Sequence, residues 1–226
     1  EIGSGLVGSE MCIRDRLKPF FEKVSRNRYL RAIRDGFISA MPFMIVGSFL
    51  LVFAYPPFSP DTTWGFARAW LDLAKQYEGR ILTPFDMTMG IMSIYICAAI
   101  AYNLGKHYVK SHQLDPFMCA MLSLMAFLLV AAPKTNGTLP VDSLGGTGIF
   151  TAILVAVYCV EMMRFLKAHN IGIRLPDQVP PMIKNSFDLL IPVLVVVLTL
   201  YPLSLLIQSH FNVLIPPDLM ALFKPL

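Results

Sequence analysis

The chain has 226 residues, of which 55% are hydrophobic and only 15% are charged, and its mean hydropathy is +0.59. A soluble domain carries about 25% charged residues, so the composition argues against an ordinary soluble protein and points to the lipid bilayer. The net charge of +4 comes without a strip of mixed basic and aromatic residues on a polar surface, so no nucleic-acid partner is predicted.

Five stretches contain no Asp, Glu, Lys or Arg, and each can supply the roughly 17–25 apolar residues that a membrane-spanning helix needs. We therefore predict an all-α membrane bundle of five transmembrane helices. The charge-free stretches are 36–60, 87–105, 116–133, 143–160 and 189–217.

Basic residues gather before the first predicted span and in the loops after the second and the fourth, whereas the other two loops are nearly neutral. Because Lys and Arg in short loops favour the cytoplasmic side, we expect a cytoplasmic N-terminus and an external chain end. Residues 17–35 carry Leu17, Phe20, Phe21 and Val24 on one helical face. This pattern predicts a cytoplasmic amphipathic arm lying in the membrane plane, with packing against the spans as the alternative.

Two "X-Pro" sites read as helix starts. Thr83 before Pro84 predicts an N-cap, with Asp86 completing the cap, and Asp115 before Pro116 predicts a second one. An acidic residue near a span can instead face a polar pathway, and this is the alternative for Asp86.

Small residues recur every four positions in two spans, which lets helix backbones approach closely in lipid. The predicted helix-packing residues are Cys97, Ala101, Gly105, Gly148, Ala152 and Ala156.

The loop between the fourth and fifth spans is stiffened by its prolines and carries several charges. It is either a rigid connector or a docking or hinge element, with candidate residues Arg174, Asp177, Pro180, Pro181 and Lys184.

No catalytic constellation is apparent. The sequence has no nucleotide-binding glycine loop and no HExxH motif, and its four cysteines show no metal-ligand spacing. We predict no catalytic residue, no metal and no cofactor.

The run "RNRYLRAIRDGFISAMPFMIVGSFLLVFAYPP" at 26–57 resembles the opening of enzyme IIC permeases of the lactose/cellobiose/diacetylchitobiose family, in the bacterial phosphoenolpyruvate-dependent sugar phosphotransferase system. "LGGTGIFTAILVAV" at 144–157, "LPDQVPPMIKNSFDLLIP" at 175–192 and "PPDLMALFKPL" at 216–226 agree in order and spacing. The similarity covers residues 17–226.

This resemblance implies a homodimer of about ten spans per subunit in the bacterial plasma (inner) membrane. Residues 36–209 would form the dimer-side N-terminal domain, and 210–226 would begin the connection to a C-terminal substrate domain. The family's sugar-site His, in an Ile-His-Gly motif, and its Glu would lie beyond Leu226. The imported β-linked disaccharide would be phosphorylated by phosphorylated enzyme IIB, which is supplied through IIA and HPr. The permease itself would contribute no phosphoacceptor, and the proline loop would be a candidate IIB contact.

Two other function classes compete with the permease. A five-span chain can act as a non-transporting membrane scaffold or assembly partner. An intramembrane enzyme is disfavoured, because no predicted span contains an acid pair.

Residues 1–16 fit neither a signal peptide nor the family. The run "LVGSEMCIRDR" at 6–16 matches the translation of a transposase-type sequencing-library adapter, residue by residue. We therefore interpret residues 1–16 as a translated adapter, not native sequence, and the chain as a fragment of a longer gene.

Overall fold

The computed structural model describes residues 27–59, 62–132, 141, 143–172 and 180–211, with the side chains of 181–186 and 207–211 left aside. Within these ranges every regular element is helical, which confirms the predicted all-α class. The elements are α2 (Arg28–Ala54), α3 (Gly65–Phe85), the π-helical turn η1 (Asp86–Gly90), α4 (Met92–His112), α5 (Pro116–Ala131), the 3₁₀ turn η2 (Gly146–Gly148), α6 (Ile149–Ala168) and α7 (Pro181–Phe211).

Four of the described helical stretches are long and apolar enough to cross a membrane: Arg28–Ala54, Gly65–His112, Gly146–Ala168 and Phe187–Leu206. The predicted third span corresponds to α5, which is apolar but only 16 residues long. Each of the five predicted spans therefore coincides with an apolar helix. The chain is a multi-pass membrane bundle, in which α5 is the helix that least fills the bilayer thickness.

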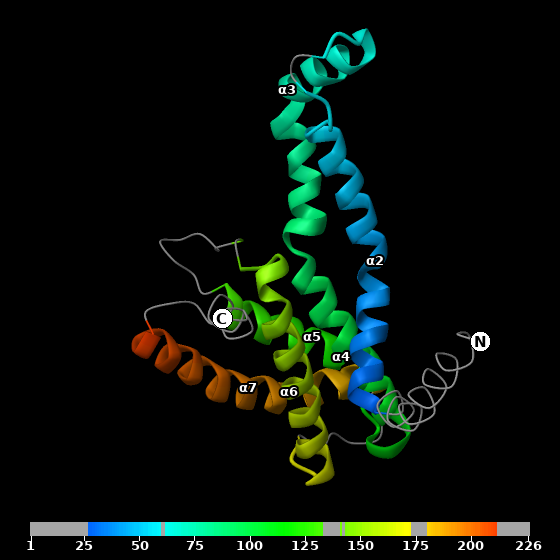
Figure 1. Ribbon diagram of the computed structural model, residues 1–226. Helices are drawn as coiled ribbons and strands as arrows, with labels where there is room; N and C mark the ends of the chain where they lie inside the picture. The colour runs from blue at the N-terminus through cyan, green and yellow to red at the C-terminus, as the bar shows by residue number, and fades with distance from the viewer. Residues whose placement is uncertain (1–26, 60–61, 133–140, 142, 173–179, 212–226) are drawn as a thin grey trace, which may run out of the picture.

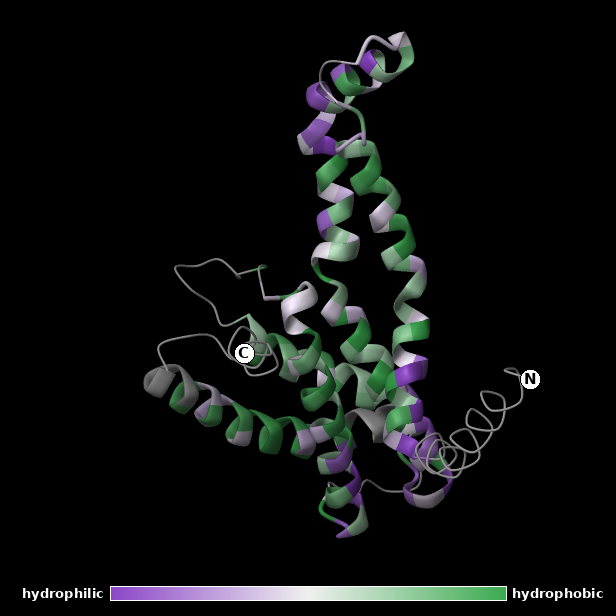
Figure 2. Cartoon of the chain, in the orientation of Figure 1, coloured by the Kyte–Doolittle hydropathy of each residue, from purple (hydrophilic) through white to green (hydrophobic). Residues whose placement is uncertain are grey.

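Helix α4 is the centre of the bundle and packs against α2, α5 and α6. Its side chains Ile96, Ile100 and Leu104 recur every four residues and are fully buried. Figure 1 shows α2 and α3 as a long pair that extends away from α5, α6 and α7. Hydrophilic residues collect at the lower ends of α2 and α6 and near the start of α3, with apolar stretches between them (Figure 2). This two-ended distribution is typical of a membrane-spanning bundle.

Helix α2 begins earlier than the charge-free stretch indicates. Asn27 caps it, since its side-chain oxygen accepts a hydrogen bond from the Tyr29 backbone N–H at 3.0 Å, and the helix continues through Asp35 without a break. The arm that we predicted for 17–35 thus shares its last eight residues, 28–35, with α2. Residues 17–26 lie outside the described part of the chain, as do residues 1–16.

The predicted helix start at Thr83 is wrong, whereas the one at Asp115 is confirmed. Thr83 lies inside α3, where its hydroxyl donates to the Gly79 carbonyl at 2.9 Å, and Pro84 lies in the last turn of the same helix. A Thr–Pro pair does not distinguish a helix start from a proline inside a longer helix, and here α3 continues through Pro84 to Phe85. The Asp115 carboxylate does accept the Phe117 N–H at 2.8 Å, as an N-cap should.

Candidate functional site

Among the described residues, we first consider two polar features of the apolar bundle. The first is a cluster around Glu161 near the C-terminal end of α6. The hydroxyls of Tyr29 on α2 and Tyr108 on α4 both donate to Glu161 Oε1, at 3.0 and 2.5 Å. Arg164 bridges the other side, with its Nη1 3.0 Å from Glu161 Oε2 and 2.9 Å from the Tyr108 hydroxyl. One carboxylate thereby joins three helices.

The charge in this cluster is balanced by more than one cation. Two guanidinium groups lie over the Tyr108 ring: that of Arg28 is 5.4 Å from the ring centroid, and that of Arg164 is 5.1 Å from it. Cations over an aromatic face gain electrostatic stabilisation, most where they are partly desolvated. Because Tyr108 is buried and its hydroxyl binds Glu161, the arrangement fixes the basic end of α2 against α4 and α6. It is a structural junction at the basic end of the bundle, not an acid–base pair with room for a substrate.

The second polar feature is the π turn η1, where α3 passes into α4. Thr88 donates to the Pro84 carbonyl at 2.9 Å, and the Tyr95 hydroxyl donates to the Met87 carbonyl at 2.8 Å. These side chains satisfy backbone groups that the irregular turn would otherwise leave without partners. Asp86 begins the turn with an exposed side chain and makes no capping hydrogen bond, so the predicted capping role is wrong for Asp86 as well.

The described residues show no cluster of metal-binding side chains. They contain no group of three or more His, Cys, Asp or Glu that could hold a metal. Cys97, Cys119 and Cys159 are free thiols, and each is 0% exposed, so none is available to a partner in the structure.

The six predicted helix-packing residues are all buried. A methyl group at Gly105 would lie 3.1 Å from Cα of Pro116 and 3.2 Å from Sγ of Cys119, so the glycine lets α4 approach the start of α5. A methyl group at Gly148 would overlap the Ser143 carbonyl oxygen. The glycine therefore lets the backbone at Ser143 lie directly against the start of α6.

The loop candidates fall mostly outside the described residues. This holds for Arg174 and Asp177 and for the side chains of Pro181 and Lys184, whereas Pro180 is exposed just before α7. Lys167, near the end of α6, links the two helices that flank this loop. Lys167 Nζ lies 3.5 Å from the Asp188 carboxylate on α7, and it donates to the Gln113 carbonyl at 3.0 Å. The sequence analysis did not identify this clamp.

Glu161 is the main residue that sequence reasoning missed. It directly follows the charge-free stretch 143–160, so the charge criterion ends the predicted span just before it, although the helix continues to Ala168. Two signals were present: Arg164 stands three residues later on the same helical face, and tyrosines stand near the matching ends of the first and second spans.

Comparison with known proteins decides the family. The sequence profile of the family described as "Phosphotransferase system, EIIC" matches residues 34–223. The chain belongs to this EIIC family.

Several relatives of this EIIC chain are lactose-specific. It is 35% identical over 214 residues to the "PTS system lactose-specific EIICB component" of Lactococcus lactis subsp. lactis, and 37% identical over 214 residues to that of Staphylococcus aureus (strain COL). Each match covers 92% of this chain and 36% of the relative, so the chain spans about a third of the length of these relatives.

A solved structure has the same fold. The crystal structure of the transporter ChbC, the IIC component of the N,N'-diacetylchitobiose-specific phosphotransferase system, matches with a TM-score of 0.77 and 30% sequence identity. The match covers 94% of this chain and 50% of ChbC. The resemblance drawn from the sequence is thereby confirmed, both for the family and for the fold.

Proposed function

We propose that this chain is the N-terminal half of the membrane permease subunit of a phosphotransferase-system group translocator that imports a β-linked disaccharide. Lactose, chitobiose and cellobiose are the candidate sugars, and import is coupled to phosphorylation of the sugar by enzyme IIB. The match to the chitobiose transporter over 94% of the chain is the observation that carries this proposal. The lactose-specific relatives support the same sugar class.

The described part of the chain acts as scaffold and leaves the chemistry to other parts of the system. Its free cysteines are buried, which argues against a phosphoacceptor here, and its polar junction at Glu161 is filled by its own side chains. Asp86 is the described residue best placed to face a polar pathway, because it is exposed at an irregular turn within an apolar helical stretch. Acidic residues in such positions are costly and are retained for function.

Enzyme IIB is the expected cytoplasmic partner. The relatives are named EIICB components, which places a C and a B part in one protein. We propose that the loop after α6 contacts IIB or serves as the hinge between domains. The clamp that Lys167 forms with Asp188 and the Gln113 carbonyl supports the docking role, since it ties α6 to α7 and to the end of α4 on either side of the loop. IIB would in turn receive its phosphoryl group through IIA and HPr.

The proposed setting is the plasma membrane of a bacterium, with the basic ends of α2, α4 and α6 on the cytoplasmic side. The proposed assembly is a homodimer, in which the present helices form the dimer-side domain. The rows of small residues support close helix contact, within one subunit or between two.

The gene beyond Leu226 distinguishes this proposal from a five-span membrane scaffold. We expect the reading frame in an independently prepared genomic sequence to continue into further apolar spans containing an Ile-His-Gly motif. A stop codon directly after Leu226 in an intact gene would favour the scaffold and count against the permease. The same sequence tests residues 1–16, which should be replaced by unrelated sequence upstream of Leu17.

A further inference from the structure

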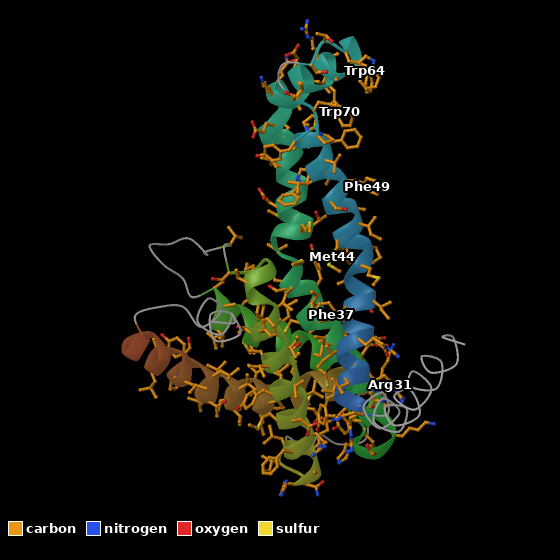
Figure 3. All side chains as sticks on the ribbon, in the orientation of Figure 1. Arg31, Phe37, Met44, Phe49, Trp64 and Trp70 are labelled. Atoms are coloured by element: carbon orange, nitrogen blue, oxygen red, sulfur yellow. The ribbon has the colours of Figure 1, made fainter. Side chains whose placement is uncertain are left out.

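An aromatic cluster closes the end of the α2–α3 pair that lies opposite the Glu161 junction. Its rings contact one another in tilted or edge-to-face geometry, with centroid distances between 5.6 and 6.0 Å. Figure 3 places Trp64 and Trp70 at this end and Arg31 at the other end of α2. We call the cluster the aromatic cap; its members are Phe53, Phe58, Trp64, Phe66 and Trp70.

The aromatic cap leaves large apolar surfaces uncovered. Trp64 is 61% exposed and Phe66 is 63% exposed, while Trp70 is half-buried and donates its indole N–H to the Phe53 carbonyl at 3.2 Å. Contiguous exposed apolar surface of this kind marks a contact with a partner or with lipid, because water would penalise it. Tryptophan suits a boundary between lipid and water, since one part of its ring is apolar and its N–H is polar.

The length of α2 places the cap at such a boundary. From Gly36, directly after the Arg34–Asp35 ion pair, to the last helical residue, Ala54, the helix is free of charge. At 1.5 Å per residue this apolar stretch is about 28 Å long, close to the roughly 30 Å thickness of the hydrocarbon core. With the ion pair at one membrane surface, the cap lies at the other, where Trp is enriched in membrane proteins.

The start of α3 has the two-sided character of an interfacial helix. Ala67 and Ala74 are buried and let it lie closely along α2, whereas Leu73 is 56% exposed beside the aromatic cap. Its remaining surface is polar and carries charges of both signs, which favours the zwitterionic headgroup region over a purely electrostatic attraction to anionic lipid. The exposed charged residues are Arg68, Asp72, Lys75, Glu78 and Arg80.

We propose that the aromatic cap inserts into the headgroup–acyl boundary of the leaflet opposite the basic helix ends and anchors the α2–α3 pair there. The partner is the phospholipid surface itself, and zwitterionic lipid is sufficient. The anchor fixes how far α2 and α3 extend through the bilayer. The anchor requires neither sugar nor phosphorylation, so it can be tested independently of the proposed transport function.

Tryptophan fluorescence tests this directly, because the 226 residues contain two Trp and both belong to the cap. The full-length protein is reconstituted in phosphatidylcholine vesicles whose acyl chains carry bromine near the headgroup or near the chain end. The signal of the cap is the difference between the unchanged protein and the Trp64→Phe/Trp70→Phe variant, which subtracts every other tryptophan. Single variants then report each indole alone.

We expect bromine near the headgroup to quench the difference signal about twofold more than bromine near the chain end, and aqueous iodide to quench it weakly. Trp64 should be quenched more than the half-buried Trp70, and added anionic lipid should change neither. Efficient quenching by iodide would put the cap in water and overturn the proposal. Protection from both quenchers would mean that protein covers the aromatic cap. Protection that is gained only on adding sugar would mean that the aromatic rings bind sugar. Either result would also overturn the proposal.

Discussion

Replacing Gly36 with leucine should strongly destabilise the bundle. A methyl group at this position would already overlap Cγ1 of Ile100, and it would lie 3.0 Å from the Ile100 backbone nitrogen and 3.1 Å from its Cα. The side chain of Ile100 can rotate, but its backbone belongs to the buried centre of α4 and cannot move without displacing the helix. The larger residue therefore pushes α2 away from α4.

Overpacking of this kind costs about 1–3 kcal/mol, which corresponds to a fall in Tm of roughly a few degrees. The measurement is thermal unfolding of the full-length protein in detergent. Gly79→Leu is the matched control, because a methyl group at Gly79 meets nothing within 4 Å and the same residue type is added to an exposed helical position. Equal Tm values for the two variants would contradict the close packing of α2 on α4.

Removing the carboxylate at Glu161 should be the most costly change among the polar residues. Glu161→Leu leaves the hydroxyls of Tyr29 and Tyr108 without an acceptor and leaves Arg164 without its carboxylate partner. Hydrogen bonds to a charged group contribute about 1.5–3 kcal/mol each. Because the Glu161 side chain keeps 25% of its exposure, water compensates part of the loss, and we expect about 2–3 kcal/mol in total.

A double-mutant cycle isolates the contact that spans from α2 to α6. We expect Tyr29→Phe and Glu161→Leu to show a coupling energy of about 1 kcal/mol in unfolding experiments in detergent. The control is the variant Asp35→Asn. Asp35 pairs with Arg34, whose side chain is 63% exposed, and such surface ion pairs contribute less than about 1 kcal/mol to the free energy of unfolding. Additive effects of the two Tyr29 and Glu161 changes would show that the junction does not hold α2.

The apolar helices could be predicted from the sequence because charge is so costly inside a bilayer that its absence marks a span. The start of α5 could be predicted for an equally local reason, the Asp115–Pro116 pair. Helix α3 was missed because its mixed charges read as an external loop. Its buried residues Ala67 and Ala74 face α2, and this contact is visible only once α2 is known to lie beside α3.

The polar junction around Glu161 could not be predicted from the sequence for the same reason. Tyr29, Tyr108 and Glu161 are separated by more than 50 residues in sequence, and only the packing of α2, α4 and α6 brings their side chains together. The loop charges Arg174, Asp177 and Lys184 remain a prediction for the complete transporter.

Phosphorylation-coupled uptake shows directly whether the full-length protein is a sugar permease. The full-length protein in sealed membrane vesicles is supplied with radiolabelled cellobiose, chitobiose or lactose, with and without phosphorylated enzyme IIB. We expect one of these sugars to accumulate as its phosphate ester only when phosphorylated IIB is present on the cytoplasmic face. Replacing Arg174, Asp177 and Lys184 together by alanine should lower that uptake, while Asp35→Asn should leave it unchanged. Absence of uptake for all three sugars, or accumulation of unmodified sugar without IIB, would contradict the proposed permease function.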